Sequence, residues 1–152
     1  MEVSYECKIC VYCLTGEGNY PVNDLQQVAT ASVTDKNQAM RILSEVCSVY
    51  PERNEAIVNA GVIALAREPG PFPGFARVAS ALDWYVGRLS QEHGIIVCSS
   101  EDPKEVQACF HVGEKVMLYI QHACITAAAY GWYFVVDEND VVQDVWYPWK
   151  GW

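Results

Sequence analysis

Hydrophobic and polar residues alternate along residues 3–13, the first patterned segment of the chain. Such alternation is typical of a half-buried β-strand, because successive side chains of a strand point to opposite faces. The turn-forming sequence TGEGN follows, and residues 25–33, LQQVATASV, have the composition of a second strand. The pattern therefore predicts an N-terminal hairpin with a long connection.

The middle of the chain shows apolar spacing that is typical of helices. Apolar residues between 39 and 50 recur three or four positions apart, and Pro51 ends the pattern. We expect further helices after Asn54, although GVIALA alone could be a buried strand, and from residue 75 up to Gly94. A long helical segment is expected over 103–130, with a capping box at Asp102 and Glu105 and a break at Gly113.

Three other segments have clear signals. Residues 95–98, IIVC, predict a short buried strand, and residues 68–74, EPGPFPG, predict a rigid loop. Two β-rich runs flank residues 137–140, DEND, and predict a C-terminal hairpin. The expected fold is α+β, with an antiparallel sheet from the N-terminal strand or hairpin and the C-terminal hairpin, packed against about four helices. We expect residues 1–152 to form a single compact domain.

The composition indicates a chain that can bury a hydrophobic core and that carries a strong negative charge. Hydrophobic residues make up 51% of the 152 residues and charged residues 19%, so the chain can bury a sizeable core. The net charge of −9 argues against direct binding to nucleic acid or to an anionic membrane surface, since both require clustered Lys and Arg. It is compatible with a protein partner that has a basic surface.

The seven cysteines indicate a reducing compartment. Their number is odd and the first residues lack the pattern of a secretory signal, so we expect reduced thiols and a cytoplasmic protein. Cys7, Cys10 and Cys13 form C-x-x-C-x-x-C, but on a strand residues three apart point to opposite faces. We therefore interpret them as strand residues and expect no metal site and no cofactor.

Cys98 is the candidate nucleophile, because it ends a buried strand just before a predicted helix start. A base would have to come from a histidine, and nothing in the sequence brings one to it. Ser99 and Ser100, near the same helix start, are candidates for holding a ligand's anion. His122 and Cys124 lie in the most apolar segment, where a histidine is more often a hydrogen-bonded core residue than a metal ligand.

The C-terminal segment combines acidic and aromatic residues. Such residues suit an interface with a basic partner, although a solvated turn on a packed hairpin explains them more simply. The candidate partner-binding residues are Asp137, Glu138, Asp140, Asp144, Trp146, Trp149 and Trp152.

Three functions are open at this point. The favoured one is a small acidic protein-binding module, an inhibitor or interaction protein of the immunity or phage counter-defence type, without catalytic activity. The alternative is a protein or enzyme with a pocket for a small ligand or cofactor. The third is a cysteine-dependent enzyme or metal protein. An open sheet edge would in addition permit a homodimer.

Overall fold

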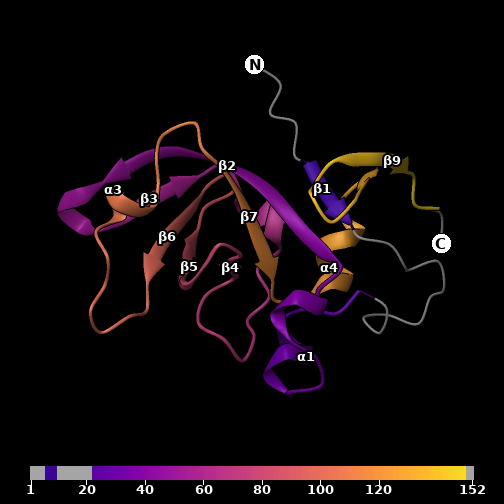
Figure 1. The fold of residues 1–152 in the computed structure, drawn as a ribbon, viewed down its shortest axis with the longest axis horizontal. Helices are drawn as coiled ribbons and strands as arrows, with labels where there is room; N and C mark the ends of the chain where they lie inside the picture. Colours follow the sequence, from indigo (N-terminus) through magenta and orange to yellow (C-terminus); the bar gives the residue numbers. More distant parts are fainter. Residues whose placement is uncertain (1–5, 10–21, 150–152) are drawn as a thin grey trace.

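Six antiparallel strands form a closed barrel in the part of the chain that this computed structural model describes, residues 6–9 and 22–149. Around the ring, each strand pairs with the next, and the last pairs with the first (Figure 1). In ring order they are β2 (Met40–Tyr50), β3 (Glu55–Val58), β6 (Gly94–Cys98), β5 (Ala81–Leu89), β4 (Ala76–Val78) and β7 (Lys115–Ile120). Closure leaves no free sheet edge within the ring.

The long strand β2 closes the barrel. Its first half pairs with β7, where Arg41 lies opposite Tyr119 and Glu45 lies opposite Lys115. Its second half pairs with β3, from Val46 to Tyr50. This eleven-residue strand is therefore long enough to pair with both β7 and β3, and so it closes the ring.

A three-stranded extension continues from β2 outside the ring. Strand β1 (Glu6–Ile9) pairs antiparallel with the first half of β2 and parallel with β8 (Tyr133–Val136). Strand β9 (Val142–Trp146) pairs antiparallel with β8, so the predicted C-terminal hairpin is present. It joins the N-terminal strand beside the barrel (Figure 1).

The helices of the described segments are all short. The α-helices are α1 (Leu25–Ala29), α2 (Val62–Leu65), α3 (Val106–Cys109) and α4 (Ala123–Ala128), and the 3-10 turns are η1 (Asp35–Asn37) and η2 (Pro51–Arg53). Across residues 6–9 and 22–149, none of the helices has the length and apolar character needed to cross a membrane.

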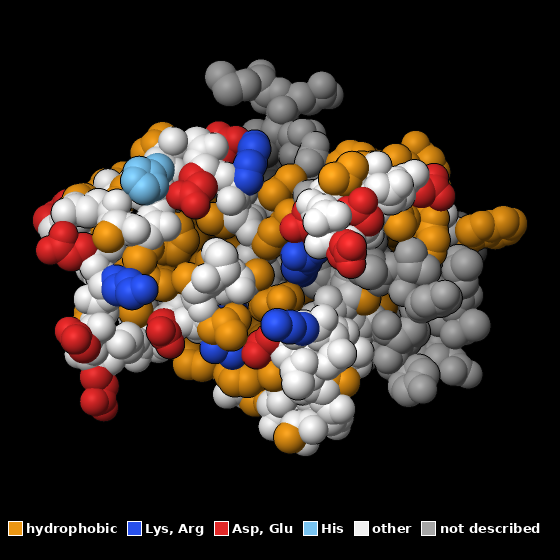
Figure 2. Space-filling model, in the orientation of Figure 1, with side chains coloured by type: hydrophobic (Ala, Val, Ile, Leu, Met, Phe, Trp, Pro, Cys, Tyr) orange, Lys and Arg blue, Asp and Glu red, His pale blue; other side chains and the backbone are white. Residues whose placement is uncertain are grey.

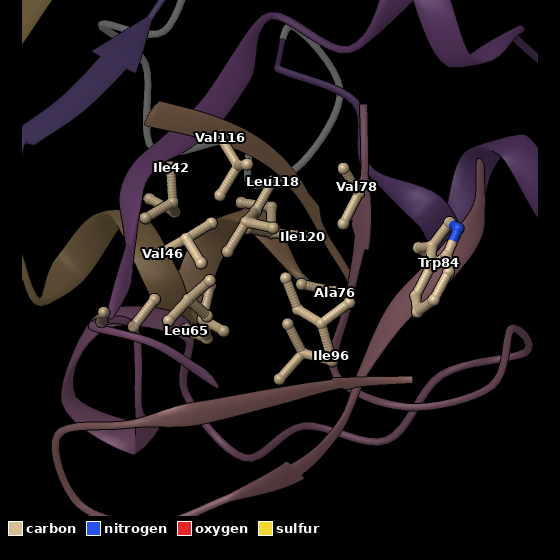
Figure 3. Packing of buried hydrophobic residues seen from close by; sticks show 14 of the residues in the cluster. Ile42, Val46, Leu65, Ala76, Val78, Trp84, Ile96, Val116, Leu118 and Ile120 are labelled. Carbon is tan, nitrogen blue, oxygen red and sulfur yellow. The ribbon is translucent and has the colours of Figure 1, made fainter. Parts of the chain in front are cut away.

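Buried side chains from all parts of the ring fill the barrel interior. Figure 3 shows them converging from opposite strands, with Ile42, Val46, Ala76, Val78, Ile96, Val116, Leu118 and Ile120 labelled. Trp84 packs edge-to-face on Phe110, with ring centroids 5.1 Å apart. Burying each large aliphatic side chain contributes about 1.5–3 kcal/mol, so this interior is the main source of stability.

The expected sheet packed against about four helices is wrong, because most predicted helices are barrel strands. In β2, the buried positions alternate as Met40, Ile42, Ser44 and Val46. Ser44 is buried as a polar residue because its hydroxyl bonds the Asn59 side chain at 2.8 Å. Polar Ser44 among the buried positions and apolar Leu43 on the opposite face interrupt the alternation of apolar and polar residues. The strand pattern was therefore not recognised in the sequence.

The other expected helices also change. The segment after Asn54 forms β3 and then α2, and the segment from residue 75 to Gly94 forms β4 and β5. The segment 103–130 divides into α3, β7 and α4, while residues 25–29 of the expected second strand form α1. The expected strand at 95–98 is confirmed as β6, and residues 68–74 have no regular structure, as predicted.

Candidate functional site

The site centres on the junction between β7 and α4. Strand β7 ends at Ile120, Gln121 and His122 follow, and α4 begins at Ala123. His122 precedes the helix with an extended backbone, at φ −140° and ψ 108°. Its side chain is therefore placed by the end of a barrel strand, which is a rigid support.

Asp24 fixes the first turn of α4 from a distant part of the chain. One of its carboxylate oxygens accepts the backbone N–H of Ala123 at 2.7 Å, and the other accepts that of Gln26 at 2.8 Å. Asp24 is fully buried. A single carboxylate thus satisfies N–H groups at the starts of both α1 and α4.

Helix α4 is also tied to α2. The Thr126 hydroxyl donates to the carbonyl of Leu65 at 3.0 Å, and the Tyr130 hydroxyl donates to that of Ala64 at 2.8 Å. Both bonds are buried, where a lost partner is costly. They hold the end of α2, and hence the start of the loop that follows it, against α4.

The loop of residues 68–74 is anchored on Gln121. Its side-chain amide donates to the carbonyls of Phe72 and Gly74, each at 2.9 Å. Gly70 lies so close that an added Cβ would be 2.0 Å from Gln121 Oε1. Arg77 stacks on the Phe72 ring, with its guanidinium carbon 4.7 Å from the ring centroid. The second half of the predicted loop is therefore held in place at Phe72 and at Gly74.

His122 has an unusual environment. Its Nδ1 is buried and has no hydrogen-bond partner, and Glu68 Oε1 lies 3.9 Å away. Cys124, partly buried, follows two residues later in the first turn of α4. Imidazole nitrogen and thiolate sulfur are both donors that Zn²⁺ and similar ions take. Within residues 6–9 and 22–149, no cluster of three or more potential metal ligands is found.

Cys98 lacks the adjacent helix start on which its candidacy as a nucleophile depended. Cys98 lies at the end of β6, opposite Trp84, and packs partly against the core. The helix expected just after it begins only at Val106. Ser99 donates its hydroxyl to the Asp83 carbonyl at 3.0 Å, and the Ser100 hydroxyl accepts the Asp102 N–H at 3.3 Å. Both serines thus serve local turns, and their role with a ligand stays a prediction.

The candidate partner-binding residues divide between turn and surface. Asp137 accepts the N–H groups of Asn139 and Val141, which lowers the pKa of its carboxyl, Val141 having the larger effect. Asp140 forms an ion pair with Arg41 of β2, and Asp144 accepts the Trp146 ring N–H at 3.1 Å.

Glu138 lies in the same turn, and Trp149 is 97% exposed, whereas Trp152 lies outside the described residues. Figure 2 shows acidic side chains interspersed with Lys and Arg on the face that it draws. No finding tests these individual assignments, which stay predictions.

The structure describes only part of the C-x-x-C-x-x-C segment. Cys7 lies in β1, as the strand interpretation expects, while Cys10 and Cys13 fall outside the described residues. Partial burial, and then the Glu45 carboxylate, raise the pKa of Cys47, which disfavours the nucleophilic thiolate form.

Sequence reasoning noted His122 and Cys124 but interpreted them as core residues, and it missed Glu68, Gln121 and Asp24. The available signal was a histidine and a cysteine two positions apart directly after an apolar run, because both side chains are metal ligands. The contributions of Asp24 and Glu68 depend on contacts across 99 and 54 residues, which no local pattern contains.

Known proteins resemble this chain in sequence. Residues 39–136 match the family described as "Putative serine dehydratase domain". D-serine dehydratase of Schizosaccharomyces pombe is 46% identical over 142 residues, and that of Saccharomyces cerevisiae is 38% identical over 147 residues. Each match covers 89% of this chain and 33% of the relative. The chain thus spans about a third of the length of the curated relatives it matches.

Solved structures share the fold. A histidine-to-alanine variant of D-threo-3-hydroxyaspartate dehydratase aligns with a TM-score of 0.78 at 22% identity, covering 88% of this chain and 37% of that one. An alanine racemase-like protein from Idiomarina loihiensis aligns with a TM-score of 0.73 at 27% identity, covering 85% and 36%. A cysteine-to-alanine variant of the first enzyme, described as metal-free, aligns with a TM-score of 0.74 at 22% identity, covering 85% and 37%.

These comparisons correct the expected function. The expectation of an inhibitor, immunity or phage counter-defence protein with a basic protein partner is wrong, because the relatives are enzymes named for small substrates. These comparisons carry no evidence for the expected homodimer. The alternative of a small-ligand pocket or enzyme fits them better. By its match over residues 39–136 and its similarity to the yeast D-serine dehydratases, the chain belongs to the serine dehydratase domain family.

Proposed function

We propose that this chain supplies the β-barrel part of a dehydratase that acts on a small amino acid with a hydroxyl beside the carbon that carries the amino group. D-serine and D-threo-3-hydroxyaspartate, the compounds named in the relatives, share that arrangement. Dehydration removes the hydroxyl from one carbon and a hydrogen from its neighbour, which leave together as water. The membership of the family supports the reaction class.

The observation that carries the location of the site is the environment of His122. A buried ring nitrogen without a hydrogen-bond partner is costly unless a bound group or a small movement satisfies it. The two dehydratase variants named above change a histidine and a cysteine whose positions are two apart, and the structure of the cysteine variant is of a metal-free form. His122 and Cys124 have the same residue types and the same spacing.

His122 and Cys124 would therefore hold a divalent metal ion, which departs from the expectation of no metal and no cofactor. Two residues apart within a helix, side chains point in different directions, but the extended backbone of His122 removes that restriction. When bound, such an ion polarises the oxygen of a substrate hydroxyl as a Lewis acid. With two ligands from this segment, coordination positions stay open for substrate atoms.

The remaining residues of the site hold and orient these ligands. Asp24 fixes the first turn of α4, and with it the backbone of Cys124. Thr126 in this helix and Tyr130 just after it donate hydrogen bonds to carbonyls of α2. Because the ligands lie at the end of a barrel strand and in a pinned helix, the site is organised before a ligand arrives.

Two further expectations stand as proposals. We propose that residues 1–152 fold as one domain, supported by the shared barrel core. A cytoplasmic location is supported by the thiols of Cys47, Cys98 and Cys109, which form no disulfide.

Titration of the chain with Co²⁺, followed by its visible and near-ultraviolet absorption, tests the site. We expect wild type to bind, and His122→Ala and Cys124→Ala each to weaken binding at least about tenfold. His111→Ala and Cys47→Ala are matched controls, because both side chains are exposed and neither is a proposed ligand. Equal binding by His122→Ala would overturn the proposal.

A second arm separates the site from the N-terminal cysteines. A variant with Cys7, Cys10 and Cys13 changed to Ser should bind Co²⁺ like wild type. Loss of binding in that variant, with binding retained in His122→Ala, would instead support a site on C-x-x-C-x-x-C.

A further inference from the structure

Nδ1 of the His122 ring faces the protein interior. The side chain is 26% exposed, yet Nδ1 itself is buried and has no hydrogen-bond partner. The exposed part of the ring therefore lies away from Nδ1. A ligand that approaches from solvent would meet the other side of the ring, where Nε2 lies.

Glu68 lies on the Nδ1 side. Its Oε1 is 3.9 Å from Nδ1, longer than a hydrogen bond but within reach of a small rotation of the carboxylate. The Glu68 side chain is 39% exposed, so it has room for that rotation. Pro69 restricts the backbone of Glu68 to extended conformations, which limits the directions in which the side chain can point.

The loop that carries Glu68 is fixed to the residue next to His122. Gln121 donates its amide protons to the carbonyls of Phe72 and Gly74, at 2.9 Å each, and leaves no room for a side chain at Gly70. The anchor and the histidine are consecutive in the chain. The hydrogen bonds of Gln121 thus hold the loop that carries Glu68 beside His122.

We propose that Glu68 is a positioning residue that accepts the Nδ1–H of His122 and so leaves Nε2 unprotonated, and that Gln121 holds Glu68 in place for this. A histidine that binds a metal through one nitrogen usually donates its other N–H to a carboxylate or carbonyl, which fixes the tautomer and the ring orientation. The benefit to a bound metal rests on the proposed function. The tautomer of the metal-free chain does not depend on it.

The direct test is ¹⁵N NMR of the histidine rings in the metal-free chain at about pH 8, where an ordinary histidine is neutral. We expect the Nδ1–H tautomer for His122 in wild type and a shift towards Nε2–H in Glu68→Ala. Glu68→Gln should retain Nδ1–H, because an amide oxygen still accepts. An Nε2–H tautomer in wild type, or no change in Glu68→Ala, would overturn the proposal.

The chain offers a matched control on its surface. Glu114 Oε2 lies 3.6 Å from Nδ1 of His111, a similar pair that is well exposed. Glu114→Ala should leave the His122 tautomer unchanged. A change at His122 in Glu114→Ala equal to that in Glu68→Ala would show a general loss of charge and contradict a specific role for Glu68.

Co²⁺ affinity is the second measurement. We expect Glu68→Ala to weaken binding about 10–100-fold, Gln121→Met to weaken it by a similar factor, and the double variant to be no weaker than either. Multiplied effects in the double variant would contradict the role of Gln121 in placing Glu68. Absence of binding in wild type would refute the proposed metal site alone, whereas equal binding by wild type and Glu68→Ala would refute this inference alone.

Discussion

The buried carboxylate of Asp24 accepts the backbone N–H of Ala123 at 2.7 Å, across 99 residues of sequence. This bond joins the segment before the barrel to the helix that begins directly after His122. Asp24 performs the capping role that the side chain before α4, His122, does not perform. His122 is therefore free of that structural task.

Removing this cap should destabilise the protein. We expect Asp24→Ala to lower the free energy of unfolding by about 3 kcal/mol, because N–H groups at the starts of both α1 and α4 lose their side-chain acceptor. Asp24→Asn should cost less, since its amide oxygen still accepts one bond. Urea denaturation measures both, with exposed Asp102→Ala as the control. A loss below about 1 kcal/mol for Asp24→Ala would contradict this role.

Ala66 has a backbone conformation that suits glycine. Its φ of 61° and ψ of 177° lie in a region that residues with a Cβ rarely adopt, at a cost of about 1–3 kcal/mol. Ala66→Gly should therefore stabilise the protein by about 1 kcal/mol, after the entropy cost of glycine. Ala64→Gly, at a buried position in α2, should instead destabilise it. Thermal denaturation of both variants tests this prediction. Destabilisation by Ala66→Gly would show that the backbone at Ala66 is not strained.

The conformation of the loop that carries Glu68 requires glycine at position 70, because a side chain there would collide with Gln121. Gly70→Ala should destabilise the protein by about 1–3 kcal/mol, because the new Cβ would overlap Gln121 Oε1. Hydrogen exchange in residues 68–76 should become faster. Gly131→Ala is the matched control, since nothing lies within 4 Å of its added Cβ. Equal effects of the two substitutions would show that Gln121 and Gly70 are not in tight contact.

The turn of the C-terminal hairpin should be sensitive to acid. The N–H groups of Val141, and then Asn139, hold the pKa of Asp137 below its ordinary value of 3.8. Because the pKa of Asp137 is lower in the folded than in the unfolded protein, its ionised carboxylate stabilises the folded state at pH values above 3.8. This stabilisation is lost as the pH falls below 3.8 and through the pKa of the folded state. The stability advantage of wild type over Asp137→Asn should shrink on acidification. A difference that stays constant from about pH 7 to about pH 2 would contradict this.

Local patterns predicted the parts of the fold that local chemistry determines. Residues 95–98 have an uninterrupted apolar run, and the hairpin around 137–140 has its turn formed by the Asp137 side chain. The barrel itself depends on pairings between distant strands, such as β2 with β7, which no window of the sequence contains. Short strands with apolar residues on both faces also resemble buried helices in their spacing.

The site was harder to predict than the fold for a related reason. His122 and Cys124 could be noted as potential ligands, but their meaning depends on Glu68 and Gln121, which reach them from a loop and from the end of a strand. The conspicuous acidic and aromatic tail drew the functional hypothesis instead. Three of its acidic residues have local partners: Asp137 in the turn, Asp140 in an ion pair with Arg41, and Asp144 in a hydrogen bond with Trp146.

The measurement that tests the central claim most directly is dehydration of D-serine by a chimera in which this chain replaces the matching third of the Schizosaccharomyces pombe enzyme. We expect release of pyruvate and ammonia, at least about tenfold slower with His122→Ala or Cys124→Ala and unchanged with His111→Ala or Cys47→Ala. A chimera that folds but does not dehydrate D-serine, or one whose activity survives both site substitutions, would contradict the account.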